Sequence, residues 1–288
     1  MGFTLRRLPH VALALVLALG VGSAAWATDY YVRTDGSDSC NGRSNTGGTG
    51  GNCAFRTISK ADSVAVCGDT IRIGAGLFSE AKLRINDACS ATTKKTIVGA
   101  GRGSTFWMGG LVDLNESACV ADSNPGVYRC PAPSGFAAGA AGDPELCFVQ
   151  RNTNAVRFLD ENGTKGDMTG PVCVTWNTSG PASVSATEGH VYYDGSGNFY
   201  IKPWNGLSPA QADFWVPSST SYSSGADGPV YLEGNHITVR DLTVIGANYC
   251  NVAGIGDDIT IEGVDVYTGM TWFESASARA TIRNVKMM

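Results

Sequence analysis

The sequence predicts an all-β chain whose strands stack as a right-handed parallel β-helix, a solenoid with an N-terminal capping helix and a disulfide-rich β insertion. Two observations support this fold class. Near the C-terminal end, Thr238, Thr260 and Thr281 recur at steps of 22 and 21 residues. Around these threonines, apolar and polar residues alternate, as a strand that is buried on one face requires. A repeat of this length buries its apolar side chains by stacking on its neighbours.

Three aligned segments, 236–244, 258–266 and 279–287, form the repeat. Neighbouring strands lie about 4.8 Å apart, so each inward side chain should rest on its equivalent in the next coil. The sequence therefore predicts four inward columns. These are Ile237, Ile259 and Ala280; Val239, Ile261 and Ile282; Leu242, Val264 and Val285; and Val244, Val266 and Met287.

The other positions of the repeat are equally regular. Outward charges alternate along the stack, which avoids repulsion between like charges. A sharp bend should divide each copy into two short strands at residues that tolerate a left-handed backbone. The charge ladder consists of Arg240, Glu262 and Arg283, with Asp265 beside Lys286, and the bends fall on Asp241, Gly263 and Asn284.

The last copy of the repeat stops at Met288, within a coil. A single coil buries too few apolar side chains to offset its loss of conformational entropy, so each coil needs neighbours or a cap on both sides. We therefore expect the chain to be the N-terminal fragment of a longer protein.

The N-terminal end has the features of a secretory signal peptide. Arg6 and Arg7 precede an apolar run over 11–21, and Ala25-Trp26-Ala27 forms a cleavage site. We expect residues 1–27 to be removed and the product to be secreted or periplasmic. No later segment has the length of a membrane span, so the chain should not cross a membrane.

Charge and composition narrow the choice of partner. The chain has 21 basic and 26 acidic residues, a formal net charge of −5. Binding to phosphate backbones needs clustered Lys and Arg, so nucleic acid is a poor partner. We expect a monomer.

Nine cysteines follow the predicted cleavage point. In an oxidising compartment they should pair, and no C-x-x-C motif points to a metal site instead. Sequence does not fix their connectivity, because eight cysteines can pair in many ways. Proximity suggests Cys40–Cys53, Cys67–Cys89, Cys119–Cys130 and Cys147–Cys173, which leaves Cys250 without a partner.

Residues 28–110 should form the N-terminal cap and the first coils. A short strand over 30–32 precedes a loop rich in Gly, Ser and Asn. Ile58, Ala61 and Ala65 then recur on one face of a helix that Thr57 can cap. Such a helix would cover the open end of the solenoid. Strands over 69–73, 83–85 and 96–98 begin the stack.

Motifs in this segment resemble the N-terminal segment of secreted β-helix proteins of the pectate-lyase-like (pectin lyase fold) superfamily. They are Tyr30-Tyr31-Val32, Gly36-Ser37-Asp38, Phe55-Arg56-Thr57-Ile58 and Gly68-Asp69-Thr70-Ile71. The resemblance covers about 30–110 and 230–288. It implies the fold and an extracellular polysaccharide as partner. It does not imply one activity, since the superfamily includes polysaccharide lyases, glycoside hydrolases and proteins without catalysis.

The pattern of the repeat is absent from the middle of the sequence, and we expect a β-rich insertion over 111–228. Residues 190–193 and 198–202 flank Asp194-Gly-Ser-Gly197 and should form a β-hairpin. The stack should resume over 229–288.

Aromatic side chains of the insertion could stack on sugar rings, or fill its small core, where they give much burial per residue. Trp204 is the leading sugar-facing candidate, because Pro203 and the following Asn-Gly place it at a strand end. Tyr200 and Lys202 complete the predicted substrate-binding set. The other aromatic candidates are Trp107, Trp176, Tyr193 and Trp215.

The resemblance implies two kinds of catalytic chemistry. Lyases of the superfamily hold calcium with Asp or Glu and use a basic side chain to take the proton α to a uronate carboxylate, whereas hydrolases use clustered Asp residues. Calcium is therefore a cofactor that the resemblance allows. The predicted catalytic residues are Asp257, Asp258 and His236. The alternative is an ordinary turn position, because Asp258 aligns with His236 and Arg279.

Two functions follow from these residues. The first is a secreted carbohydrate-active β-helix protein that binds or cleaves an extracellular polysaccharide, by β-elimination if it is a lyase. The second is a non-catalytic cell-envelope or adhesive protein whose solenoid is a rigid display surface.

Overall fold

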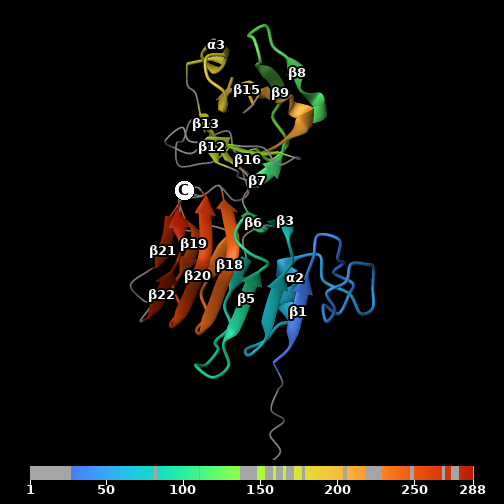
Figure 1. The fold of residues 1–288 in the computed structure, drawn as a ribbon, viewed down its shortest axis with the longest axis vertical. Helices are drawn as coiled ribbons and strands as arrows, with labels where there is room; N and C mark the ends of the chain where they lie inside the picture. Colours follow the sequence, from blue (N-terminus) through green and yellow to red (C-terminus); the bar gives the residue numbers. More distant parts are fainter. Residues whose placement is uncertain are drawn as a thin grey trace, which may run out of the picture.

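The structure is a computed structural model. It describes residues 27–80, 83–109, 111–136, 148–152, 158–159, 165–166, 172–176, 179–203, 206–217, 229–246, 250–267, 270–273 and 279–287. The described part is mostly β, with few short helices, and its strands lie in two parallel sheets, one mainly antiparallel sheet and a two-stranded antiparallel pair (Figure 1). The all-β prediction is confirmed.

The larger parallel sheet contains the predicted repeat. All its pairings are parallel, and its strands come from both ends of the chain. The main order is β1 (Asp29–Val32), β2 (Thr70–Ile73), β5 (Lys95–Gly99), β18 (Ile237–Gly246), β20 (Ile259–Tyr267) and β22 (Ala280–Arg283), with β3 (Gly76–Glu80), β6 (Thr105–Gly109) and β23 (Lys286–Met287) beside it.

A second parallel sheet contains β4 (Leu83–Ile85), β17 (Val230–Leu232), β19 (Cys250–Gly254) and β21 (Met270–Phe273). From β17 to β22 the chain visits the two parallel sheets in turn, one strand at a time. Each strand pairs in parallel with the strand two places along the chain. Such alternation is what stacked coils require. The right-handed solenoid stays a prediction.

The predicted register of the repeat is confirmed. Thr238 pairs with Thr260, and Thr260 pairs with Thr281. The inward positions of the first two copies are fully buried, from Ile237 and Ile259 to Val244 and Val266.

The third copy of the repeat departs from the predicted burial. Ala280 is exposed, and Ile282 and Met287 are 47% and 60% exposed. These residues lie in β22 and β23, which pair with β20 on one side. No described strand covers their other side, so the inward columns are buried only in the first two copies.

The predicted bends also have their expected backbone. Asp241, Gly263 and Asn284 adopt φ values of 57°, 62° and 52°. His236 and Asp258, at the start of their copies, have φ values of 55° and 54°, which fits the alternative that they occupy turn positions. Each of the first two copies therefore has one residue with a left-handed backbone at its start and another at its bend.

The N-terminal helix α2 (Ile58–Val64) covers one end of the core, as predicted. Its N-cap is Thr57, whose hydroxyl accepts a hydrogen bond from Lys60 N at 3.1 Å. The loop before the helix also covers the outer edge of β1, since Tyr31 N donates to Gly42 O at 2.7 Å and Phe55 N donates to Tyr31 O at 2.9 Å. This edge is therefore hydrogen-bonded rather than open.

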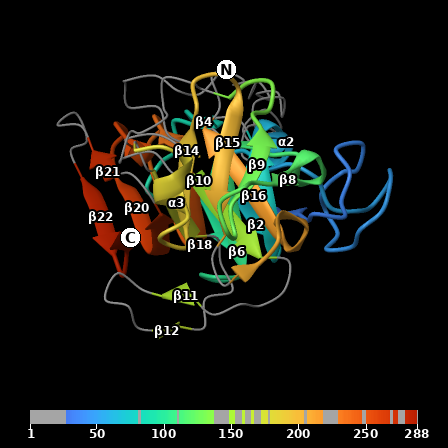
Figure 2. The same ribbon diagram turned by 90° about the horizontal axis from the view of Figure 1, so that it is seen from above.

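The middle of the chain forms an eight-stranded sheet with a core of its own. Figure 1 shows it above the parallel sheets, and Figure 2 shows it in front of them, seen from above. The predicted hairpin is confirmed, with Tyr193 opposite Phe199. The sheet order is β7 (Leu111–Asp113), β16 (Ala212–Pro217), β10 (Phe148–Asn152), β13 (Val172–Trp176), β14 (His190–Tyr193), β15 (Asn198–Lys202), β9 (Tyr128–Pro131) and β8 (Val120–Ala121).

Short elements complete the described chain. They are the β11 (Phe158–Leu159) and β12 (Lys165–Gly166) pair, α3 (Pro181–Val184) and the 3-10 helices η1 (Glu116–Ala118) and η4 (Pro209–Gln211). None of the described helices has the length and apolar character of a membrane span.

Three of the predicted disulfides are confirmed: Cys40–Cys53, Cys67–Cys89 and Cys119–Cys130. They fit a protein of an oxidising compartment. The predicted Cys147–Cys173 bond and the side chain of Cys250 lie outside the described residues, as do residues 1–26 of the predicted signal peptide.

Candidate functional site

An open cleft of about 490 Å³ lies between the parallel strands and the antiparallel sheet. Strand β3 forms one wall, and Trp215 of β16 lies across from it. The remaining lining residues, Thr34, Arg56 and Thr57, come from the loop that covers β1 and from the cap of α2.

Local sequence positions each wall of this cleft. Gly76 has φ 130°, and a Cβ atom there would lie 2.6 Å from Thr34 Cγ2, so glycine permits this close approach. Glu80 ends β3 and accepts hydrogen bonds from Ser59 N at 2.9 Å and from Ser59 Oγ at 2.6 Å. The Glu80 carboxylate thus ties β3 to the first turn of the capping helix.

Trp215 closes the cleft from the side of the insertion. Its partners across the sheet are Val149 and Asp113. The half-buried indole packs against an apolar cluster formed by Phe106, Met108, Leu111 and Ile245, and Leu77 of β3 packs against the same cluster. Trp215 is therefore held by this cluster and also lines the cleft.

The residues that line the cleft include Trp215, the basic Arg56, the acidic Glu80 and hydroxyl-bearing threonine and serine residues, together with the apolar Leu77 and Phe78. A sugar presents apolar C–H faces and a ring of hydroxyls, so an aromatic platform beside hydrogen-bonding groups suits it. Arg56 is exposed and can donate to hydroxyl or carboxylate oxygens.

Two of the predicted catalytic residues are in contact. His236 Nδ1 lies 2.7 Å from Asp258 Oδ2, and Lys94 Nζ lies 3.2 Å from the same oxygen. The hydrogen bond from His236, with that from Lys94, holds the pKa of Asp258 below its ordinary value. We call His236, Asp258 and Lys94 the His236 cluster.

The third predicted residue, Asp257, has a different role. Its carbonyl accepts a hydrogen bond from His236 N at 2.8 Å, and its own N–H donates to Asn235 Oδ1 at 2.9 Å. Its carboxylate lies 3.5 Å from Arg279 Nη2. These bonds connect the starts of successive copies, as the turn-position alternative predicts.

The His236 cluster and the cleft are different sites. His236 precedes β18, next to the start of β5. The cleft borders β3, whose neighbour β6 pairs with the far end of β18. No residue is shared between them, so the predicted catalytic residues do not line the cleft.

Two of the predicted substrate-binding residues, Tyr200 and Lys202, lie in a third place. Tyr200 faces Tyr192 with ring centroids 6.0 Å apart, on the half-exposed face of the hairpin. Lys202 Nζ donates to Ser185 O at 2.6 Å, which gives it a structural role. Trp204 and the side chain of Trp176 lie outside the described residues. Trp107 is fully buried and belongs to the core.

The predicted charge ladder has its expected register, since Arg240 lies beside Glu262, Glu262 beside Arg283 and Asp265 beside Lys286. Its ion pairs follow this register only in part. Glu262 pairs with Arg283 at 3.1 Å, as predicted. Arg240, however, pairs with its neighbour Asp241 at 2.6 Å, and Asp265 lies 3.3 Å from Arg102. Arg240 thus pairs with the next residue in the sequence, and Asp265 pairs with a residue of an earlier loop.

Among the described residues, no group of three or more His, Cys, Asp or Glu side chains could hold a metal ion. The Asp194 carboxylate, in the hairpin turn, accepts from Ser196 N at 2.7 Å and from Asn198 N at 3.0 Å. Although burial alone would raise its pKa, these hydrogen bonds and one from the Asn198 side chain lower it. The Asp194 carboxylate is therefore hydrogen-bonded within its own turn. A bound calcium ion stays a prediction.

Comparisons with known proteins concern the fold. No family model and no curated protein matches the chain. A structure of XylC in complex with xylose is similar at 14% identity and a TM-score of 0.50, over 90% of this chain and 54% of that one. A structure described as a glycoside hydrolase is similar at 10% identity and a TM-score of 0.51, over 84% of this chain and 64% of that one. The chain thus spans between half and two thirds of the length of these structures, and at such identities the likeness shows the fold alone.

Proposed function

We propose that the chain is a secreted carbohydrate-active protein whose parallel strands form a right-handed β-helix, and that it binds an extracellular polysaccharide in the cleft beside Trp215. The observation that carries the proposal is the composition of the cleft. Trp215 and Arg56 line an open space of about 490 Å³ together with polar and apolar residues of β3. The neighbouring fold is also one on which proteins named for carbohydrate chemistry are built.

The geometry favours binding along the cleft rather than at its rim. Leu77 and Trp215 share one apolar cluster, which fixes the distance between the two walls. A preformed cleft binds its ligand without the cost of ordering its own side chains. An extended sugar chain can therefore lie between β3 and the insertion.

Affinity electrophoresis through gels that contain neutral or acidic polysaccharides tests this proposal. We expect the mature protein to be retarded by at least one of them. Trp215→Ala should weaken that retardation roughly two- to tenfold, the value of one aromatic contact. Tyr192→Ala, on the hairpin face, is the matched control and should behave like wild type. Equal retardation of Trp215→Ala and wild type, or no retardation in any gel, would contradict the proposal.

Cleavage is a second candidate, favoured by the His236 cluster. The contact between His236 Nδ1 and Asp258 fixes the ring, and in the tautomer that donates from Nδ1 the other nitrogen, Nε2, would be the general base. In β-elimination this base would take the proton α to a uronate carboxylate. Lys94, 3.2 Å from Asp258, adds positive charge beside it.

Absorbance of an unsaturated product, recorded with and without calcium, measures this activity. We expect His236→Ala to abolish product formation while polysaccharide binding is kept. If no polysaccharide yields product and binding is retained, the non-catalytic envelope or adhesive function is favoured instead.

A further inference from the structure

A lysine occupies a place where the next two copies along the core have isoleucine. Lys95 pairs in register with Ile237, which stands above Ile259 in the next copy, and all three side chains are fully buried. An isolated ammonium group is very costly to bury, so its neighbours must explain its presence.

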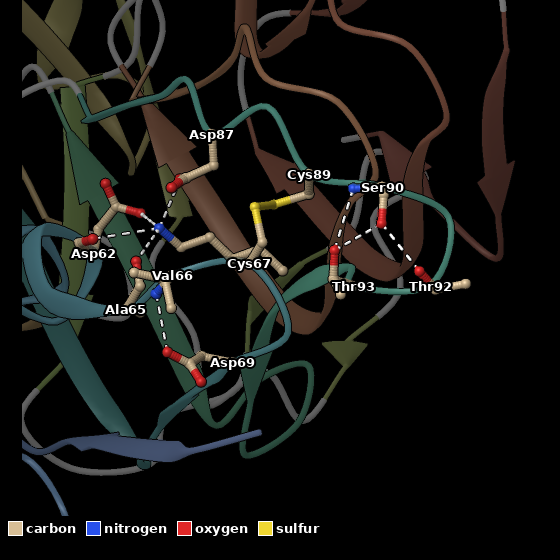
Figure 3. The surroundings of a disulfide bond; sticks show 11 residues. Asp62, Ala65, Val66, Cys67, Asp69, Asp87, Cys89, Ser90, Thr92 and Thr93 are labelled. Carbon is tan, nitrogen blue, oxygen red and sulfur yellow. Dashed lines mark hydrogen bonds and ion pairs between the residues drawn. A yellow bond between two sulfur atoms is a disulfide. The ribbon is translucent and has the colours of Figure 1, made fainter. Parts of the chain in front are cut away.

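Two carboxyl groups surround the amine. Lys95 Nζ lies 2.7 Å from Asp62 Oδ1 and 2.7 Å from Asp87 Oδ2. It also donates to Ala65 O at 3.0 Å and to Asp62 O at 3.3 Å, at the end of helix α2. Figure 3 shows Asp62 and Asp87 converging beside the Cys67–Cys89 disulfide.

The two carboxyl groups are not equivalent. Asp87 Oδ2 hydrogen-bonds to the amine, whereas Asp62 Oδ1 lies at the same distance but has no hydrogen-bond partner among the described groups. Burial raises the pKa of Asp62, although Lys95 opposes this effect, so this carboxyl group takes up a proton more readily than an ordinary aspartate. A neutral carboxylic acid beside an amine is the pair of functional groups from which an amide forms.

We propose that Lys95 and Asp62 form an intramolecular isopeptide bond, with Asp87 as the proton carrier. The proton of the buried ion pair passes to Asp62, which leaves a neutral amine. Nζ of Lys95 attacks Cγ of Asp62 and a C–N bond forms. Asp87 accepts a proton from the nitrogen and delivers it to the leaving hydroxyl, so the Cγ–O bond breaks and one water molecule departs. No oxidant or reductant is needed, and a neutral amide replaces two buried charges.

The position of the bond suits a stabilising cross-link. Asp62 is in the capping helix, and Lys95 begins β5 of the stack, so the bond would tie the cap to the coils. Cys67–Cys89 joins the same two segments inside that loop. Asp87 is fixed by a hydrogen bond from Asn235 N to its carbonyl at 2.9 Å, which holds its carboxylate against the amine.

Intact mass spectrometry of the reduced, unfolded mature protein tests the proposal. We expect a mass lower than that of its residues by one water molecule. Trypsin does not cleave after an acylated lysine, so digestion should also yield one branched peptide that joins residues 61–72 to residues 95–102. Its fragment ions should assign the link to Asp62.

Two variants serve as controls. Lys95→Arg keeps the charge and cannot form the amide, so it should have its full mass and yield no branched peptide. Asp87→Asn should lose most of the branched peptide while both linking residues are kept. A wild-type protein with its full residue mass would overturn the proposal and leave a buried ion pair at the end of the helix. A link from Lys95 to Asp87 would overturn the assignment of Asp62.

Discussion

Individual side chains show where sequence reasoning about the site succeeds. His236 and Asp258 occupy equivalent positions of the repeat, so their alignment predicts that they lie side by side. Their contact at 2.7 Å confirms that proximity. Lys94 contacts Asp258 from a segment more than a hundred residues earlier in the chain. No local sequence pattern predicts this contact.

The cleft and the buried lysine were missed because both depend on distant partners. Arg56 and Thr57 were part of a family motif, and Trp215 was one aromatic candidate among several. Nothing in their local sequence indicates that β3 and β16 lie on opposite sides of one space. Lys95 follows Lys94 at the start of a strand, and only the register shows that it points into the core.

The paired state of Asp258 should make stability depend on pH. The pKa of Asp258 is lower in the folded chain than its ordinary value of 3.8, so its stabilising effect is present above that value and is lost as the pH falls through the folded pKa. Asp258→Asn should therefore lower the free energy of unfolding at pH 7 by about 0.5–1 kcal/mol, as for an exposed pair. Urea denaturation at pH 7 and below pH 3 measures it. The difference should shrink at the acidic pH, and a difference that grows there would contradict the assignment.

Glu262 tests the charge ladder. Glu262→Lys should lower the free energy of unfolding by roughly 0.5–1 kcal/mol, because the new cation would lie beside Arg283 and Arg240. Thermal or urea denaturation at low and high salt measures it, and salt should reduce the loss. Glu262→Gln, which removes the charge without reversing it, should lose less. Loss of polysaccharide binding at unchanged stability would instead give Glu262 a functional role.

At the scale of elements, those built from local signals could be predicted and those built from distant pairing could not. The cap at Thr57 and the hairpin at Asp194 each depend on residues a few positions apart, and both formed as expected. The order of the antiparallel sheet is different. In the pair of β7 and β16, Leu111 lies opposite Pro217, about a hundred residues away in the sequence. The alternation of apolar and polar residues alone does not determine which strands pair over such a separation.

The disulfides connect these elements, and their number can be measured. Titration of the unfolded, unreduced mature protein should find about one free thiol, since four pairs leave one of the nine cysteines. Three free thiols would mean that Cys147 and Cys173 do not pair. Five or more would contradict the three disulfides at Cys40–Cys53, Cys67–Cys89 and Cys119–Cys130.

Across the whole molecule, the parallel sheets act as a frame for a sheet inserted between their strands. The chain leaves the larger sheet after β6 and returns to the stack at β17 (Figure 1). The insertion has its own core, and its contact with the frame brings Trp215 over β3. The repeat sets the frame, whereas the proposed binding cleft depends on Trp215 of the insertion. This explains why the fold was easier to predict than the site.

Hydrogen exchange of the mature protein, recorded with and without a polysaccharide that retards it, tests the proposed function most directly. Exchange reports the burial of individual amides, so it locates the ligand without a mutation. We predict slower exchange at Gly76–Glu80 of β3 and at residues 212–217 of β16, with little change at Tyr192 and Tyr200. Protection confined to the hairpin face or to the surroundings of His236, with none along β3, would contradict binding in the cleft.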